Sequence, residues 1–303
     1  MTEHYAATIG FFDGVHRGHQ HLLQQVRETA RQHALRSMVV TFAEHPRGVV
    51  CPDRRPLLLT TPEAKRALIE AQGIDRCVVL PFTAATARMT SEEFLRLLAQ
   101  HYGVRVLLIG HDHHFGHDVG ATVADYARYG AAVGIDIVRA TAYAERGEMV
   151  SSSRIRRALA EGMMEDAVRW LGHPYALPGT VVEGCKIGRT MGFPTANIRP
   201  ERGDLLVPAR GVYAAWVVTH DGARHAAMVN IGRRPTFGDD WATTIEAHLL
   251  GFDGDLYGER LTLHFAKRLR DEKRFPDSAA LRAQLEDDAL RAETALLQND
   301  FKL

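Results

Sequence analysis

Residues 4–20 read HYAATIGFFDGVHRGHQ, and this stretch decides how the first half of the chain folds. It begins with apolar residues typical of a short buried strand, and a glycine-rich loop follows. From His19 to Ala34 the apolar residues then fall on one helical face. A buried strand that passes through such a loop into an amphipathic helix is the repeating unit of parallel α/β sheets.

The same alternation continues through the first half of the chain. The sequence predicts further strands at residues 37–42, 77–82, 104–110 and 135–140, and helices at 61–73, 90–103 and 122–134. Wholly apolar strands that alternate with helices indicate a parallel sheet covered on both faces. Ligands bind beyond the carboxyl ends of such strands, so we expect the loops at residues 10–19 and 110–116 to meet at that edge.

The second half of the chain has a different pattern. Short strand-like runs lie at residues 179–184, 211–218, 225–232, 243–252 and 260–269, with turn signals between them. Strands without intervening helices predict an antiparallel barrel. A closing helix begins at residues 276–278, and its apolar stripe consists of Leu281, Leu285, Ala289, Ala292 and Leu296. We therefore expect one domain at residues 1–172, a Pro- and Gly-rich linker at 173–178 and a second domain at 179–303.

The overall composition excludes several classes of protein. The formal net charge of the 303 residues is zero, which gives no indication of nucleic-acid binding. The three cysteines are far apart and form no CxxC pair, which argues against a disulfide framework or a cysteine-based zinc site. There is no signal peptide and no apolar run of the ~18 residues that a membrane helix needs. We expect a cytoplasmic protein that does not bind membranes, and the sequence gives no indication of protein partners.

His16 and His19 lie between glycines at the predicted start of the first helix. They could be incidental polar residues of a helix start, or two ligands of a metal, although no third ligand follows at a suitable spacing. A phosphate site fits better, because free backbone N–H groups and the helix dipole attract an anion there. Glycines at 10, 14 and 18 would let the backbone approach it.

The string GFFDGVHRGHQHLL at residues 10–23 resembles the His-x-Gly-His signature of nucleotidyltransferases. In its longer form it is similar to the FMN adenylyltransferase module of bacterial bifunctional riboflavin kinase/FAD synthetases. The strings VTFAEHP (40–46), IGHDHHFG (109–116) and VSSSRIRRAL (150–159) resemble further motifs of that family, in the same order. The resemblance implies a Rossmann-like α/β nucleotidyltransferase domain.

The resemblance also implies roles for individual residues. It makes His16 and His19 catalytic, and it assigns Asp112 to substrate or nucleotide contact. The residues that it assigns to ATP and its phosphates in this domain are Gly10, Phe12, Asp13, Gly18, Ser152, Ser153 and Arg156. One of the serines at 151–153 would serve as the helix N-cap. The histidines at 111, 113, 114 and 117 leave a zinc site as an alternative, but the resemblance gives their loop to substrate binding.

The string GRTMGFPTANI at residues 188–198 resembles the signature of riboflavin kinases. Neither a P-loop nor a protein-kinase motif occurs in the chain. With matching strings downstream, the resemblance covers roughly residues 6 to 298 and implies a mainly-β kinase barrel with a closing helix. It makes Thr195 and Asn197 ligands of Mg²⁺, for which hard oxygen atoms are suited.

The remaining kinase residues follow from the same resemblance. Gly188 and Gly192 would let a loop close over ATP, Glu246 would act as base or orienter at the ribityl hydroxyl, and Arg270 would lie near the flavin. Both also have simpler interpretations, Glu246 as a solvent-facing strand residue and Arg270 as a loop arginine. The alternation of polar and apolar residues along the predicted strand does not show which of the two interpretations of Glu246 is correct.

These observations predict a bifunctional enzyme that uses Mg²⁺ and ATP, phosphorylates riboflavin to FMN and adenylylates FMN to FAD. Two alternatives stay open. One is a riboflavin kinase whose adenylyltransferase half has drifted, suggested by His113, Met149 and the nine residues before Gly10. The other is a flavin-binding sensor without turnover, against which Thr195, Asn197 and Glu246 argue.

Overall fold

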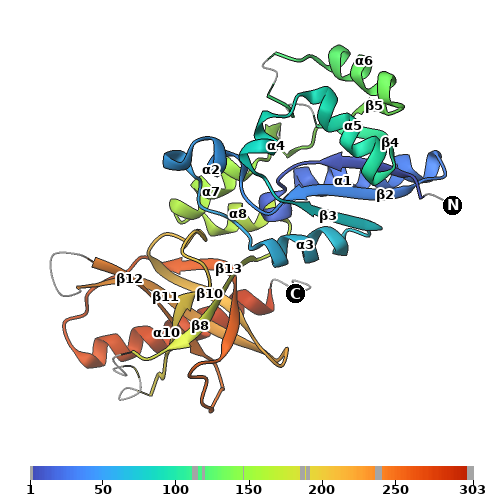
Figure 1. The fold of residues 1–303 in the computed structure, drawn as a ribbon. Coiled ribbons are helices and arrows are strands. Elements are labelled where there is room, and N and C mark those ends of the chain that lie inside the picture. Colours follow the sequence, from blue (N-terminus) through green and yellow to red (C-terminus); the bar gives the residue numbers. More distant parts are fainter. Residues whose placement is uncertain are drawn as a thin grey trace. The chain divides into compact units, whose positions relative to one another are not determined.

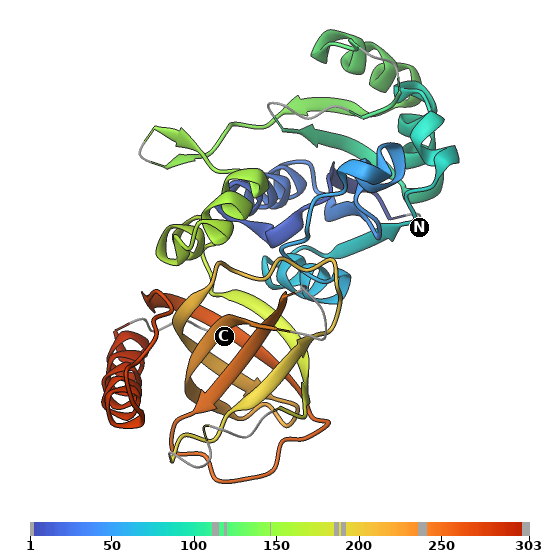
Figure 2. The ribbon, with the colours of Figure 1, turned by 90° about the vertical axis from the view of Figure 1, so that its left-hand side faces the viewer.

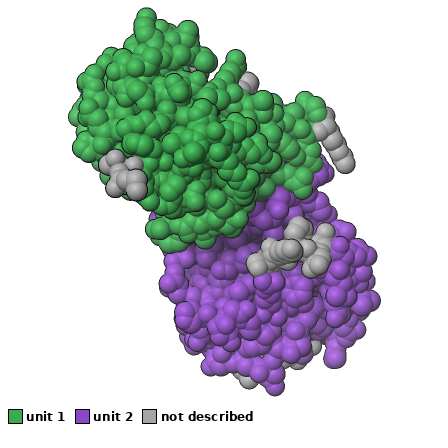
Figure 3. All heavy atoms as spheres, turned by 90° about the vertical axis from the view of Figure 1, so that its right-hand side faces the viewer, with its two compact units in different colours: residues 1–151 green, residues 152–303 purple. Residues whose placement is uncertain are grey.

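The computed structural model describes residues 3–110, 115–117, 120–145, 147–184, 188, 192–235 and 241–298. The chain divides into two compact units, residues 1–151 and residues 152–303 (Figure 3). Among the described residues, no helix combines the length and the apolar composition that crossing a bilayer requires.

The first unit is built on a five-stranded sheet in the order β3-β2-β1-β4-β5. All neighbouring strands are parallel, as the sequence predicts. The strands are β1 (Tyr5–Ile9), β2 (Arg36–Phe42), β3 (Arg76–Leu80), β4 (Val104–Ile109) and β5 (Asp136–Arg139). The order reverses between β1 and β4, and open α/β sheets bind ligands beyond the carboxyl ends of the strands at such a point.

Helices cover both faces of this sheet. The residues that share a core with one face come from α1 (Arg17–Gln32) and α3 (Pro62–Ala71), and those on the other face from α5 (Ser91–Tyr102) and α6 (Val123–Val133). In Figure 1, α3 and α5 lie on opposite sides of the sheet. Neighbouring residues of β1 show the division, since Ala6 joins the first core and Ala7 the second.

Short elements complete the first unit. They are the 3₁₀ turns η1 (Asp13–Val15) and η2 (Pro52–Arg54), the helices α2 (Pro46–Val50) and α4 (Ala84–Arg88), and the hairpin strands β6 (Ala144–Glu145) and β7 (Glu148–Met149). The helix starts follow the sequence closely: a capping box joins Thr90 and Glu93 at the start of α5, and Gly103 ends that helix in the left-handed conformation.

The second unit contains a closed antiparallel barrel in the order β10-β11-β12-β9-β8-β13 (Figure 2). Two helices, α7 (Ser152–Ala160) and α8 (Met164–Leu171), precede it. The strands are β8 (Tyr175–Val182), β9 (Ala196–Pro200), β10 (Gly211–Thr219), β11 (Arg224–Pro235), β12 (Trp241–Leu249) and β13 (Arg260–Arg270). The predicted barrel is confirmed, and β9 is a sixth strand beyond the five apolar runs.

The first barrel strand begins earlier than the sequence indicates. Residues 175–178, expected to form part of a linker, are the first half of β8. Alternate side chains of this strand are buried, and the hydroxyl of Tyr175 donates a hydrogen bond to the backbone carbonyl of Leu206 at 2.5 Å. Pro178 fits into the strand although it has no N–H to donate.

The closing helix α10 (Ser278–Leu297) packs along the outside of the barrel (Figure 2). It shares a core with residues of β10, β11 and β13, to which it contributes Ala292, Ala295 and Leu296. Leu285 and Ala289 of the predicted stripe are partly buried against that core. Asp288 also lies on this side of the helix and is fully buried, which the apolar pattern does not predict.

Candidate active sites

The loop after β1 has an unusual backbone conformation. Phe12, Gly14 and Val15 have φ angles of 55°, 77° and 38°. Left-handed backbone is costly for the phenylalanine and for the β-branched valine, and such strain gathers at functional sites. Both side chains are buried in the core beneath the loop, which holds the turn in place.

The turn places His16 and His19 at the start of α1. The two imidazoles stack with centroids 3.6 Å apart and planes 16° apart. The Nδ1 atom of His16 also accepts a hydrogen bond from the backbone N–H of His19 at 3.3 Å, so His16 is the N-cap of the helix. A Cβ atom at Gly18 would lie 3.2 Å from the His16 ring. A side chain at this position would press on the stacked pair, which glycine avoids.

The Asp13 carboxylate is held by hydrogen bonds within the protein. Its carboxylate is buried and accepts hydrogen bonds from the backbone N–H groups of Leu59 and Thr60 at 3.0 and 3.1 Å. The Thr60 hydroxyl donates to it as well, at 3.0 Å, and accepts from the N–H of Gly14. Asp13 thus shapes the loop. Like Phe12, it is buried beneath the loop in this structure.

The serine and arginine residues predicted to bind phosphate open α7, which belongs to the second unit. Ser153 is exposed, and Ser152 and Arg156 are partly exposed, while Ile155 is buried. The hydroxyls and the guanidinium are therefore on the accessible side of the first helical turn, where backbone N–H groups also attract an anion.

The histidine-rich loop after β4 is only partly within the described residues. Asp112 and His113, together with His111 and His114, fall outside them. The described Phe115 is a core residue whose ring stacks on Tyr126. Within the described ranges, no group of three or more His, Cys, Asp or Glu side chains is arranged to hold a metal ion.

Two cavities adjoin the barrel, and Thr195 lines both of them. The first, the Glu246 pocket, has a volume of about 360 Å³ and lies between the outer face of the barrel and α10; its lining includes Glu246, Arg270, Gly188 and Asp288. The second, the loop pocket, has a volume of about 520 Å³ and is lined by the segment 252–257. A group held at Thr195 therefore faces both cavities.

Glu246 faces the Glu246 pocket and not open solvent. Its neighbours Ile245 and Ala247 are buried on the other side of β12. Asn197 on β9 is its direct partner across the two strands, and the Thr195 hydroxyl donates to Glu246 Oε2 at 3.3 Å. Hydroxyl, amide and carboxylate oxygens thus gather at one place, which is the donor set that Mg²⁺ prefers. These residues fit the ion that the sequence implies.

Glycines let the backbone approach this cluster. A Cβ atom at Gly184 would lie 2.0 Å from Asn197 Nδ2, and one at Gly188 would lie 2.3 Å from the backbone oxygen of Phe193. Gly192 has a φ of 85°, as a turn over the site requires. The sequence singled out Gly188 and Gly192. Gly184 was missed, since it lies outside the recognised string.

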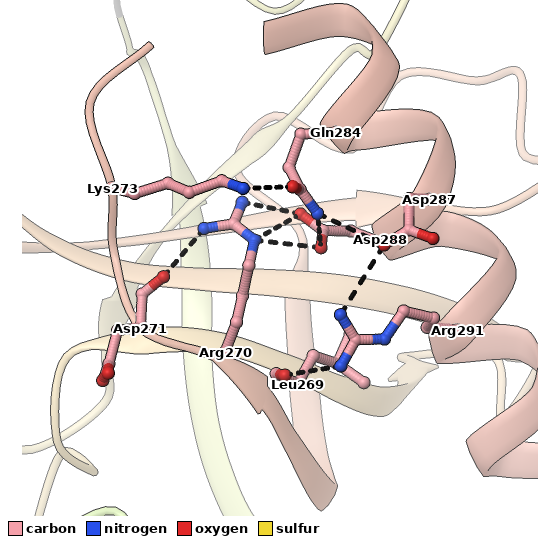
Figure 4. A network of polar contacts seen from close by, with 8 residues as sticks. All are labelled: Leu269, Arg270, Asp271, Lys273, Gln284, Asp287, Asp288 and Arg291. Atoms are coloured by element: carbon pink, nitrogen blue, oxygen red, sulfur yellow. Dashed lines mark hydrogen bonds and ion pairs between the residues drawn. The ribbon is translucent and has the colours of Figure 1, made fainter. Parts of the chain in front are cut away.

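Arg270 ends β13 (Figure 4). Its side chain lines the Glu246 pocket. Its Nε and Nη2 atoms donate to the carboxylate of Asp288 at 2.9 and 2.6 Å. Gln284 donates to the same carboxylate at 2.9 Å and accepts from Lys273, so four side chains join α10 to the pocket. This network was not predicted from the sequence. It explains why Asp288 is buried on the side of α10 that carries the apolar stripe.

The fold and these sites define the class of protein: a nucleotide-binding α/β unit joined to a barrel with a hydroxyl–amide–carboxylate cluster. The model of the family described as FAD synthetase matches residues 1–154, and that of riboflavin kinase matches residues 171–296. The chain belongs to the family of bifunctional riboflavin kinase/FMN adenylyltransferases, as the sequence analysis predicted.

Individual relatives cover nearly the whole chain. The bifunctional riboflavin kinase/FMN adenylyltransferase of Pseudomonas fluorescens is 38% identical, over 94% of this chain and 91% of its own. That of Escherichia coli K12 is 36% identical over 94% and 90%. A solved structure described as a macrolide-efflux protein from Streptococcus pneumoniae shares the fold, with a TM-score of 0.87 and 29% identity over 97% of this chain and 95% of its own.

Proposed function

We propose that this chain makes FMN and FAD in two successive reactions, each carried out by its own set of residues. The observation that carries the proposal is the cluster of Thr195, Asn197 and Glu246 beside the Glu246 pocket. Such a cluster suits transfer of phosphate to a hydroxyl, whereas a protein that only stores flavin has no use for it. The family membership supports both reactions, riboflavin to FMN and FMN to FAD.

In the kinase reaction, riboflavin would occupy the Glu246 pocket and ATP the loop pocket. The terminal ribityl oxygen forms a bond to the γ-phosphorus, the bond from that phosphorus to the bridging oxygen breaks, and ADP leaves. Glu246 accepts the hydroxyl proton. Thr195 and Asn197 would hold Mg²⁺, which when bound neutralises developing charge on the phosphate oxygens. The position of Thr195 between the pockets supports this arrangement.

In the adenylyltransferase reaction, a phosphate oxygen of FMN forms a bond to the α-phosphorus of ATP, and pyrophosphate leaves. The His16 and His19 imidazoles would donate hydrogen bonds to the phosphate oxygens. Ser152, Ser153 and Arg156 would stabilise the departing pyrophosphate, and Asp112 would contact substrate. We place both reactions in the cytoplasm, where ATP is available, with small molecules as the only proposed partners.

Replacing His19 by Ala tests whether the two reactions depend on separate sets of residues. FAD formation from supplied FMN should be lost, and FMN formation from riboflavin should stay close to normal, because His19 belongs to the first unit and the kinase residues Thr195 and Glu246 to the second. Equal loss of both activities in a folded variant would contradict the proposal. A wild-type protein that makes FMN but no FAD would instead favour a kinase with a drifted adenylyltransferase half.

A further inference from the structure

Lys65 on α3 is the buried lysine of the first unit, with an exposed fraction of 2%. Its ammonium donates a hydrogen bond to the backbone carbonyl of Phe42 at 2.8 Å and lies 3.8 Å from the centroid of the Phe11 ring. Burying an ammonium costs free energy because the group loses its hydration, and contacts with one carbonyl and one aromatic face offset only part of that loss. A group retained at such cost invites a functional explanation.

The two partners of Lys65 lie at the carboxyl ends of two neighbouring strands, one in the loop after β1 and one at the end of β2. Phe11 lies in the loop that leads from β1 to His16, and Phe42 is the last residue of β2. The two segments are also joined directly, since Thr41 donates to the backbone carbonyl of Phe11 at 3.1 Å. The Phe11 ring packs on His45, with centroids 4.5 Å apart. Lys65 thus lies beneath the junction of the two segments.

We propose that Lys65 is a positioning residue for the adenylyltransferase reaction: its ammonium fixes Phe11 and the end of β2, so that the loop presents the histidine pair in its reactive geometry. The inference rests on the function proposed for the first unit. Lys65 itself touches no reacting atom. Its effect passes through the Phe11 ring and the strained turn that follows it.

The charge of Lys65 can change within an experimentally accessible pH range. Burial lowers its pKa to about 8, although the nearby ionisable groups Asp13, Cys77 and Glu44 act to raise it. Above that pH the neutral amine still donates a hydrogen bond, but it no longer attracts the aromatic face. Deprotonation should therefore loosen Phe11 and slow FAD formation.

Stability should change in the opposite direction. The ordinary pKa of a lysine is 10.5, so between about pH 8 and 10.5 the unfolded chain binds more protons than the folded one, and this group's contribution to stability rises with pH. A lysine with a merely structural role would give a more stable enzyme with unchanged turnover. A positioning role predicts that turnover falls over the range in which stability rises.

The test compares Lys65→Met with Arg66→Met in the full chain. Arg66 is the next residue of α3, is exposed, and forms a surface ion pair with Glu70. FAD formation from supplied FMN and MgATP, and FMN formation from riboflavin, are measured from pH 7 to 9.5. We expect Lys65→Met to lower kcat for FAD formation by about tenfold to hundredfold, with a smaller change in KM for FMN. It should also lack the alkaline decline of the wild type.

Riboflavin kinase activity should be normal in both variants, and Arg66→Met should be normal in every assay. A folded Lys65→Met protein with wild-type kcat and the wild-type pH profile would overturn the inference. If that variant fails to fold, the pH dependence of the wild-type protein tests the inference. A wild-type turnover for FAD formation that stays constant above pH 8 while the melting temperature rises would also overturn the inference. A wild type that forms no FAD would refute the proposed function instead.

Discussion

Arg270 and Asp288 form a two-pronged ion pair that links the end of β13 to the middle of α10, 18 residues further along the chain (Figure 4). The Asp288 side chain is fully buried, and the Arg270 side chain is 15% exposed. Because Arg270 also lines the Glu246 pocket, the pair joins the stability of the closing helix to the shape of that pocket.

Replacing Asp288 by Ala should destabilise the second unit by about 3 kcal/mol, since it leaves a largely buried guanidinium without its partner. The double variant Arg270→Met/Asp288→Leu should regain most of that stability, because an apolar pair of similar size replaces the buried charges. It should not regain kinase activity if Arg270 holds the flavin. Urea unfolding and an FMN-formation assay measure the two effects, and a double variant with full activity would contradict the role of Arg270.

Replacing Gly184 by Ala should damage the kinase without unfolding it. The added methyl group would lie 2.0 Å from Asn197 Nδ2, so the amide must leave its present position on the strand beside Glu246. We expect a higher Mg²⁺ requirement and a kcat lower by about tenfold or more. The control is Gly203→Ala, where no atom lies within 4 Å of the new methyl group. Equal behaviour of the two variants would argue against Asn197 as a metal ligand.

Glu246→Gln should lower kcat for FMN formation by on the order of 10²–10⁴-fold while riboflavin binding changes little. The amide keeps the size of the side chain and its contact with Thr195, but it cannot accept the hydroxyl proton. FAD formation from supplied FMN serves as the internal control and should be unchanged. A variant with near-normal kcat would remove Glu246 from the proposed mechanism.

A fragment that begins at Ser152 should fold and convert riboflavin to FMN, and one that begins at Gly179 should be much less stable. The shorter fragment lacks Tyr175 and Leu177, both buried in the barrel by β8. It also lacks α7 and α8, and the backbone carbonyl of Leu159 on α7 accepts a hydrogen bond from Ala209. Thermal melting of both fragments checks the prediction, and equal melting temperatures would contradict it.

Local patterns were sufficient to predict the sheet of the first unit and most of the barrel. Apolar strands, capping residues and turn glycines act over a few neighbouring residues, so the sequence records them directly. The strand β9 is not among the five apolar runs because it has five residues and lies at the end of the string 188–198, whose structural interpretation is a glycine-rich connection that ends in a strand. The early start of β8 was missed because Pro and Gly near residue 178 also indicate a linker.

A site residue could be predicted from the sequence only where it belongs to a recognisable sequence motif. Glu246 could not be assigned to a face by alternation, because its environment is set by Asn197 on β9 and by Thr195, which directly precedes that strand. The buried charges of Lys65 and Asp288 depend on partners brought near by the tertiary fold. Sequence patterns treat such residues as polar surface, so neither could be identified before the structure.

The central claim is that one chain carries out both reactions in order, and a single incubation tests it most directly. Purified protein is mixed with riboflavin and MgATP, and the flavins are separated by chromatography over time. The account predicts that FMN forms first and FAD follows, and that EDTA abolishes product formation, since both proposed reactions would use ATP with Mg²⁺. Riboflavin that remains unchanged, or FMN that accumulates without any FAD, would contradict the claim.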